Sequence, residues 1–457
     1  MSDILDRLLA KDATLWPDGN VGTTRLGWVD IAERMLAEAD DLQSWANGVD
    51  APTVVLLGMG GSSLGPEVLR SIKGSDRLIV LDTTDPATIA DVSDITDAFY
   101  LVSSKSGGTL EVQSLLSHFR TIVSDGSRYA AITDPGTVLE SQAREYGFAR
   151  TFSNDANIGG RYSVLSYFGL VPAALLGYDI RELLEGTRSV QGDDAVGLGM
   201  SMARAALEGK DKVSILCRPE HLAFGLWVEQ LIAESTGKHD KGCVPVPSAT
   251  QESGPDRFHA EVHIETPSDL GREFLHWEIA TAVAGHVLKI DPFDEPNVAE
   301  SKANSAKVLS SLPIPDPHDE VTVAPAGVVD WLQAQVSDGD YVSIQAYLPY
   351  ASDDRIDALA TEKVRRRLSD ALGTTAVTVG FGPRFLHSTG QLHKGGPNKI
   401  IAVQVMATAP TAEVDIPNQP YDFSTLIAAQ AIGDFGSLRS HERRCVRTFA
   451  DSIEELS

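Results

Sequence analysis

Two short loops of the sequence carry residue types that bind a phosphate group. The first, GMGGSSLGP, follows the apolar run TVVLL, and the second, SSKSGGTLE, follows AFYLV; each precedes a predicted helix. Glycines let a ligand approach the backbone closely, and a helix N-terminus offers free N–H groups and a positive dipole to an anion. Hydroxyl and ammonium groups add hydrogen bonds to the phosphate oxygens. We therefore predict that the phosphate-binding residues are Gly61, Ser62, Ser104, Lys105, Ser106 and Thr109.

The first loop also fits the beginning of a dinucleotide-binding fingerprint. Gly58 and Gly60 have the required spacing, and Asp82 ends the next apolar run, where a ribose-binding acid would stand. The third glycine of that fingerprint is replaced by Ser63, which favours a small phosphoester over a dinucleotide. A nicotinamide-dependent dehydrogenase and a plain glycine turn are disfavoured but stay open.

Three further motifs follow the two loops in the chain. They are GGRYSVLSYFGLVP at 159–172, WVEQLIAESTGK at 227–238 and PFDEPNVAESK at 292–302. Together with the loops they resemble the glucose-6-phosphate isomerase family, which has the sugar isomerase (SIS) fold, and the resemblance spans about residues 53–312. The tail, with FGPRFLHSTGQLHKGGPN, is similar to the isomerase part of transaldolase and glucose-6-phosphate isomerase fusions. Because residue 1 already begins the isomerase part, we expect a stand-alone isomerase.

The resemblance implies that Glu234 moves the proton in this chain. Interconverting an aldose and a ketose transfers a proton between adjacent carbons, which one carboxylate can do as base and then as acid. Glu234 lies near the end of an apolar helix capped by Gly237, where partial burial would raise its pKa. The alternative is a surface ion pair with Lys238 four residues later.

The same resemblance assigns Arg161 to the charge of the cis-enediolate intermediate, which needs a fixed cation. The alternative for Arg161 is a structural arginine that satisfies loop carbonyls. Gln230 stands one helical turn before Glu234 on the same face, so it is expected to bind the same substrate oxygens.

Sugar phosphates bind mostly as closed rings, so ring opening needs further groups. The resemblance implies Lys302 and a histidine, but the family's GTNGQHS segment has no match in residues 239–301. LHSTGQLHKGG arrives after the lysine motif instead, and we predict His387 as the ring-opening histidine, with His393 as second candidate. A loop-ordering role for either histidine stays open.

One further departure concerns Glu295, which replaces a family glutamine that helps to hold phosphate. An ionised carboxylate beside phosphate would repel it. Glu295 must therefore point away, pair with an arginine or lysine, or belong to a differently tuned site.

The elements that must position these residues alternate as in a parallel sheet. Between Thr53 and Thr133, four short apolar runs alternate with helical segments, and the second half repeats this more loosely. The predicted class is α/β, with two doubly wound parallel-sheet SIS-type subdomains, helical connections and a smaller C-terminal α/β piece. We predict N-terminal helices and the first SIS subdomain over 1–190, the second over 191–312, and a C-terminal extension over 313–457 that ends in a helix, Ser424–Ala450.

Composition narrows the function classes further. The 457 residues carry 64 acidic and 38 basic side chains and a net charge of −26, which argues against nucleic-acid and anionic-membrane partners. Apolar runs are far shorter than a membrane helix, no signal peptide is evident, and three scattered cysteines form no disulfide framework. Cytoplasmic localisation is therefore expected. No metal-ligand spacing is present, because His259 and His263 only share one face of a predicted strand.

The family resemblance implies an isomerase that interconverts D-glucose 6-phosphate and D-fructose 6-phosphate in glycolysis and gluconeogenesis, and we expect no metal or cofactor. The family further implies a homodimer whose histidine reaches the neighbouring subunit's site. Activity on mannose 6-phosphate stays undecided, and a non-catalytic sugar-phosphate sensor is the alternative from another class.

Overall fold

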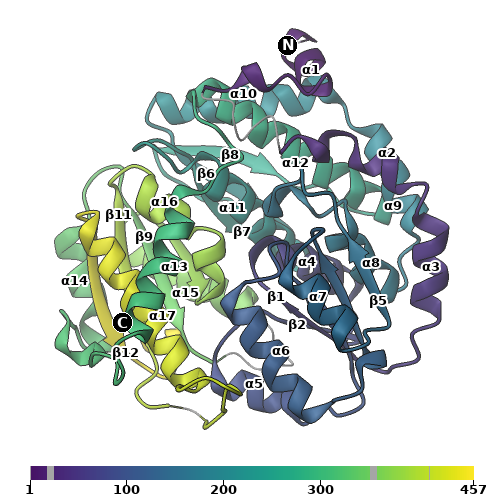
Figure 1. Ribbon diagram of the computed structural model, residues 1–457. Coiled ribbons are helices and arrows are strands. Elements are labelled where there is room, and N and C mark those ends of the chain that lie inside the picture. The colour runs from purple at the N-terminus through teal and green to yellow at the C-terminus, as the bar shows by residue number, and fades with distance from the viewer. Residues whose placement is uncertain (1, 18–24, 350–357, 411, 457) are drawn as a thin grey trace.

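The computed structural model describes residues 2–17, 25–349, 358–410 and 412–456, which form three parallel sheets with helices around them (Figure 1). The predicted α/β class with repeated parallel sheets is confirmed. No helix in the described ranges is long and apolar enough to cross a membrane.

The first sheet is the doubly wound unit predicted from the alternating apolar runs. Its strands lie in the order β2-β1-β3-β4-β5, with β5 partly exposed at one edge and the other four buried. The chain places β2 on one side of β1 and then crosses to the other side for β3, β4 and β5. Such a reversal opens a crevice at the carboxyl ends of the strands. The strands are β1 (Val54–Gly58), β2 (Leu78–Leu81), β3 (Phe99–Ser103), β4 (Tyr129–Thr133) and β5 (Arg150–Ser153), and the intervening helices are α4 (Leu64–Lys73), α5 (Pro86–Ser93), α6 (Leu110–Ile122) and α7 (Val138–Glu145).

Helices from the N-terminus and from the middle of the chain cover this sheet. The N-terminal helices bury Trp28, Ile31, Met35, Ala39 and Leu42, which recur at three- and four-residue spacing, in the largest hydrophobic cluster. α3 packs on α8, which in turn packs on α4. The helices of this part are α1 (Ser2–Leu9), α2 (Ile31–Met35), α3 (Ala39–Asn47), α8 (Tyr167–Leu175), α9 (Ile180–Gly186) and α10 (Gly192–Leu207).

The second sheet has three parallel strands in the order β7-β6-β8. Helix α11 leads from β6 to β7 and is buried along nearly its whole length, as its apolar sequence predicts. It packs on α12, which in turn lies against α10. The elements are β6 (Lys212–Leu216), α11 (Leu222–Thr236), β7 (Val244–Ser248), β8 (Arg257–Glu261) and α12 (Pro267–Leu288).

The third sheet has four parallel strands in the order β10-β9-β11-β12. The predicted helix over Ser424–Ala450 is wrong in its second half, because α17 ends at Ser440 and residues 444–449 form β12. Val446 is buried and pairs in register with Val403 of β11, so the alternating sequence RCVRTF completes the sheet. The elements are α13 (Pro296–Leu309), α14 (Val328–Gln335), β9 (Tyr341–Tyr347), α15 (Ala358–Ala371), β10 (Ala376–Phe381), α16 (Gly390–Gly395), β11 (Ile400–Met406), α17 (Phe423–Ser440) and β12 (Arg444–Phe449).

The second and third sheets share part of their core. Val244 and Val246 of β7 belong to the same hydrophobic cluster as Tyr341, Ala376 and Ile400 of the third sheet. α13 also packs along α17, so residues on both sides of position 312 lie side by side (Figure 1). The boundaries at 190/191 and 312/313 stay predictions. Helix α15 begins at Ala358, the first described residue after position 349.

Candidate active site

A cavity of about 240 Å³ brings together almost all the predicted site residues. It lies where the loops after β1 and β3 meet the GGRYS segment, α11, α13 and the turn before α16. Of the predicted residues, only Ser104 is not part of its wall. The lining residues are Arg25, Met59, Gly60, Gly61, Ser62, Lys105, Ser106, Thr109, Gly160, Arg161, Gln230, Glu234, Glu295, Val298, Lys302 and His387.

The first loop packs against the GGRYS segment at van der Waals distance. A Cβ atom added to Gly61 would lie 2.1 Å from the carbonyl oxygen of Gly160. The neighbouring Gly60 has a φ of +56°, which side chains rarely adopt. These two positions therefore require glycine, and the contact places the loop directly beside Arg161.

The second loop gathers its hydroxyl groups at the start of α6. The Oγ of Ser104 lies 3.1 Å from the Oγ1 of Thr109, and Ser106 Oγ lies 3.5 Å from the same atom. Lys105 lines the cavity, but its ammonium group donates to Asp134 of the loop after β4. Burial raises the pKa of Asp134, while Lys105 opposes that rise.

Glu234 is buried near the end of α11 with both carboxylate oxygens held. Arg161 Nη1 donates to Oε1 at 3.0 Å, and Gln230 Nε2 donates to Oε2 at 3.1 Å. Burial raises the pKa of Glu234, and Arg161 opposes that rise. The surface ion pair with Lys238 is wrong, because Lys238 is itself buried and pairs with Asp294 at 2.8 Å.

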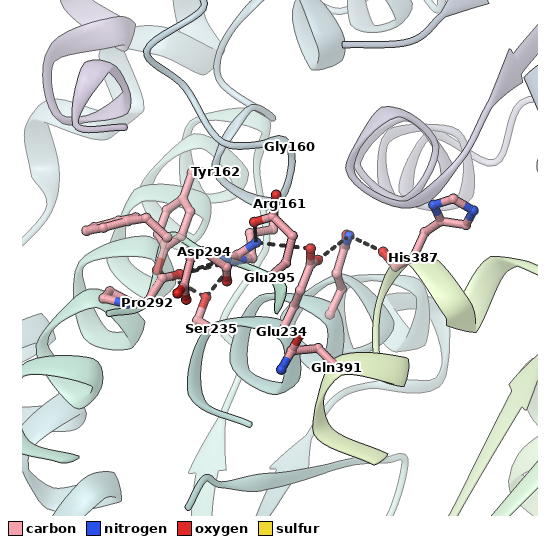
Figure 2. Close-up of polar contacts among 12 residues, drawn as sticks. Gly160, Arg161, Tyr162, Glu234, Ser235, Pro292, Asp294, Glu295, His387 and Gln391 are labelled. Carbon is pink, nitrogen blue, oxygen red and sulfur yellow. Dashed lines mark hydrogen bonds and ion pairs between the residues drawn. The ribbon is translucent and has the colours of Figure 1, made fainter. Parts of the chain in front are cut away.

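Arg161 is only 2% exposed and is fixed along its whole guanidinium group (Figure 2). Nε donates to Ser235 Oγ at 2.9 Å, and Nη2 donates to the carbonyl oxygens of Pro292 at 2.6 Å and Asp294 at 2.9 Å. Nη1 faces the cavity residues Glu234 and Glu295. The carbonyl contacts expected of a structural arginine are present, and they aim one nitrogen at the Glu234 carboxylate. The role of Arg161 in the reaction stays a prediction.

Glu295 is paired, which was one of the arrangements expected for it. Its Oε2 accepts from Arg161 at 3.1 Å, and its Oε1 lies 3.9 Å from Arg25. Burial alone would raise its pKa, but the two arginines hold it below the usual value. Its negative charge is therefore largely compensated.

His387 enters the cavity from a 3₁₀ turn, Arg384–His387, of the same chain. Its Nε2 lies 2.9 Å from Glu111 Oε1, and its carbonyl oxygen accepts from Gln230 at 2.9 Å. The expectation of a histidine that reaches a neighbouring subunit's site is wrong for His387, which lines the cavity of its own chain. Lys302, on α13, is exposed and contributes to the same wall.

His393 lies elsewhere, inside the packing of the third sheet. Its ring nitrogens are 3.3 Å from Ser343 Oγ and 3.1 Å from Gln345 Nε2. Burial holds the pKa of His393 well below its usual value. Of the two candidate histidines, the geometry therefore supports His387.

The sequence prediction missed three residues that hold the site. Ser235 fixes Arg161, Glu111 contacts His387, and Gln430 donates to Glu111 Oε1 at 2.7 Å. Ser235 and Glu111 stand inside motifs already singled out, AESTGK and SGGTLE, so their position was a usable signal. Gln430 is 319 positions from Glu111, and no local pattern indicates that contact.

Clusters of three or more metal-ligating side chains are absent from the part of the chain that the structure describes. The three cysteines are free.

Comparison with known proteins gives a consistent result. Residues 14–194 match the family model "Phosphoglucose isomerase". A "Glucose-6-phosphate isomerase" of Mycoplasmopsis pulmonis is 26% identical over 397 residues, which cover 63% of this chain and 91% of the relative. A "Probable glucose-6-phosphate isomerase" of Haloarcula marismortui is 29% identical over 381 residues, which cover 78% of this chain and 79% of the relative. For the relative from Trichormus variabilis, 29% identical, the match covers 46% of each chain.

A solved glucose-6-phosphate isomerase from Chlamydia trachomatis is 18% identical to this chain. The alignment covers 64% of this chain and 76% of that one with a TM-score of 0.49. The fold assignment therefore rests on the three parallel sheets themselves. The segment that supplies Arg161 thus matches the phosphoglucose isomerase family model, and the chain is similar to two relatives named as glucose-6-phosphate isomerases along most of their length.

Proposed function

We propose that this protein interconverts D-glucose 6-phosphate and D-fructose 6-phosphate by proton transfer, without a metal ion. The observation that carries the proposal is the buried carboxylate of Glu234, held by Arg161 and Gln230 in the cavity that also contains both phosphate-type loops. A carboxylate whose pKa is raised by burial is suited to accept and return a proton near neutral pH.

The reaction starts with ring opening. In the neutral imidazole of His387, Nε2–H donates to the Glu111 carboxylate, which leaves Nδ1 as the proton acceptor for the anomeric hydroxyl. Lys302, across the cavity, supplies the proton for the ring oxygen as the bond between the anomeric carbon and that oxygen breaks. The product is the open-chain sugar phosphate.

Glu234 then takes the proton from C2 of the open-chain aldose. The electron pair moves into a C1–C2 double bond, and the carbonyl oxygen at C1 becomes the oxyanion of a cis-enediolate. The Nη1 of Arg161, already 3.0 Å from the base, is suited to stabilise that charge. Return of the proton to C1 and transfer of the hydroxyl proton from O2 to O1 give the ketose, so no electron acceptor is needed.

Binding of the substrate is assigned to the two loops. The phosphate would be held by Ser62 of the first loop and by Ser104, Lys105, Ser106 and Thr109 of the second. Gln230 would also bind the substrate. Its buried Oε1 has no hydrogen-bond partner among the described residues and can accept a hydrogen bond from a substrate hydroxyl. We further propose a cytoplasmic homodimer that acts in glycolysis and gluconeogenesis.

The test is an assay for glucose 6-phosphate formed from fructose 6-phosphate in the presence of a chelator. We expect activity that survives the chelator and falls by about 10²- to 10⁴-fold in Glu234→Gln. Glu229→Gln is the matched control, because Glu229 is also buried on α11 but does not line the cavity. Saturable binding without turnover by the wild type would contradict the proposal and favour a sugar-phosphate sensor.

A further inference from the structure

A network of hydrogen bonds runs from the loop after the edge strand β2 of the first sheet to His387. Thr84, in the loop after β2, donates from Oγ1 to the Oε1 of Gln430 on α17 at 2.7 Å. Gln430 Nε2 donates to Glu111 Oε1 at 2.7 Å, and the same oxygen lies 2.9 Å from His387 Nε2. Thr84, Gln430 and Glu111 are each no more than 5% exposed.

The carboxylate of Glu111 fixes the direction of every hydrogen bond in this network. An ionised carboxylate only accepts, so Gln430 must turn its amide NH₂ toward Glu111. The amide oxygen of Gln430 then faces Thr84, whose hydroxyl must donate. On the other side of the carboxylate, His387 must present Nε2–H, which leaves Nδ1 as the free nitrogen.

From this geometry we infer that Gln430, oriented by Thr84, is a positioning residue for ring opening: it holds Glu111 ionised and fixed so that His387 keeps one tautomer and one orientation. The inference rests on the proposed function, since it deepens the role given to His387. The inference gives helix α17 a role in the chemistry of a cavity whose lining residues all precede this helix in the sequence.

The charged surroundings of Glu111 support this role. The titratable groups that influence Glu111 from packed elements are His387, Lys302 on α13 and Tyr347 on β9. Burial alone would raise the pKa of Glu111, but His387 and its hydrogen bond, with a contribution from Lys302, hold it below the usual value. Removing the amide donor of Gln430 from this buried carboxylate disfavours its charged form.

Ring opening can be measured separately from isomerisation. In a Glu234→Gln background the C2 proton is not transferred, and the remaining reaction is exchange between the α and β anomers of glucose 6-phosphate. NMR exchange spectroscopy gives its rate after subtraction of the spontaneous rate. We expect Gln430→Leu in this background to slow anomer exchange about tenfold or more, with inorganic phosphate bound as before.

The pH at which anomer exchange is lost on the acid side is the readout, called the acid limb below. A merely structural role of Gln430 would not change that pH. With Gln430→Leu the pKa of Glu111 rises, so the carboxylate becomes protonated, and exchange is lost, at a higher pH than in the parent. Thr84→Val, which removes only the distant hydroxyl, is expected to give a smaller change in the same direction. If Gln430→Leu does not fold, Thr84→Val provides the test instead.

Gln404→Leu is the matched control, because Gln404 is also a buried glutamine that bonds α17, donating to Ala431 O at 2.9 Å, but it does not line the cavity. Anomer exchange within twofold of the parent in Gln430→Leu, an unmoved acid limb, or an equal loss in Gln404→Leu would overturn the inference. A wild type that neither isomerises nor opens the ring would instead overturn the proposed function, and the inference with it.

Discussion

The Nη1 atom of Arg161 lies 3.0 Å from Oε1 of Glu234 and 3.1 Å from Oε2 of Glu295, so a single nitrogen is shared between two carboxylates. The family glutamine at the position of Glu295 would not carry that second charge. The proton affinity of Glu234 is therefore set jointly by burial, by Arg161 and by Glu295.

Replacing Glu295 is expected to move the pH profile of the reaction. Burial is the main cause of the raised pKa of Glu234, and the charge of Glu295 raises it further. In Glu295→Gln this repulsion disappears, so the pKa of Glu234 falls, and activity persists to a lower pH than in the wild type. The measurement is kcat against pH between 4 and 9. Glu295→Asp keeps the charge and should keep the acid side of the wild-type pH profile. An identical acid side in all three proteins would refute the coupling between Glu295 and Glu234.

Glu229 is expected to make the protein less stable as the pH rises. Burial raises its pKa from 4.5 to about 8, with Arg384 opposing. The folded state therefore binds more protons than the unfolded state between about pH 4.5 and 8, and stability falls with pH across that window. Glu229→Gln stays neutral, so it should be nearly as stable as wild type at pH 4 and more stable by a few kcal/mol at pH 9. Urea unfolding at a series of pH values checks this; a pH-independent difference would contradict it.

The close approach of Gly61 to Gly160 is expected to be intolerant of a methyl group. In Gly61→Ala the new Cβ would meet the Gly160 carbonyl at 2.1 Å, so the GGRYS segment must move. We expect a loss of about 1–3 kcal/mol in unfolding free energy and of about 10²-fold in kcat/KM, because Arg161 shifts with its segment. Gly436→Ala on α17 is the control, since its Cβ would meet no atom within 4 Å. Equal behaviour of the two variants would show that the contact is unimportant.

Because His387 and Glu234 line one cavity of one chain, inactive chains should not complement each other. A mixture of His387→Ala and Glu234→Gln chains, denatured and refolded together, is expected to remain as inactive as either variant alone. A site that took its histidine from a neighbouring chain would regain up to a quarter of the wild-type sites in such a mixture. The readout is the isomerase assay, with jointly refolded wild-type protein as the control for recovery.

The parts of the site that local sequence motifs encode could be predicted, and those that depend on distant contacts could not. Glu234, Arg161 and both loops stand in continuous segments, where strand ends and helix starts determine what meets at the sheet edge. The pairing of His387 with Glu111 joins positions 276 residues apart, so only the folded chain reveals it. The sequence shows that Glu295 departs from the family's glutamine, but only the folded structure shows that it pairs with Arg161.

The misassigned end of α17 has a similar physical reason. The segment SHERR, residues 440–444, contains no glycine or proline, which are the usual signals for the end of a helix. The chain nevertheless turns there, with Glu442 at a φ of +55°, a conformation that glycine normally supplies. Pairing of β12 with β11 stabilises this turn, and such pairing is not visible in a single segment.

If Lys105 binds the substrate phosphate, as proposed above, its contact with Asp134 couples substrate binding to proton uptake. When its ammonium group turns from Asp134 to an incoming phosphate, it leaves behind a buried carboxylate. Burial raises the pKa of that carboxyl, and Lys105 no longer opposes the rise. That carboxylate then takes up protons from solvent. A lower pH therefore favours substrate binding, and the binding enthalpy depends on the ionisation enthalpy of the buffer, which isothermal titration calorimetry measures.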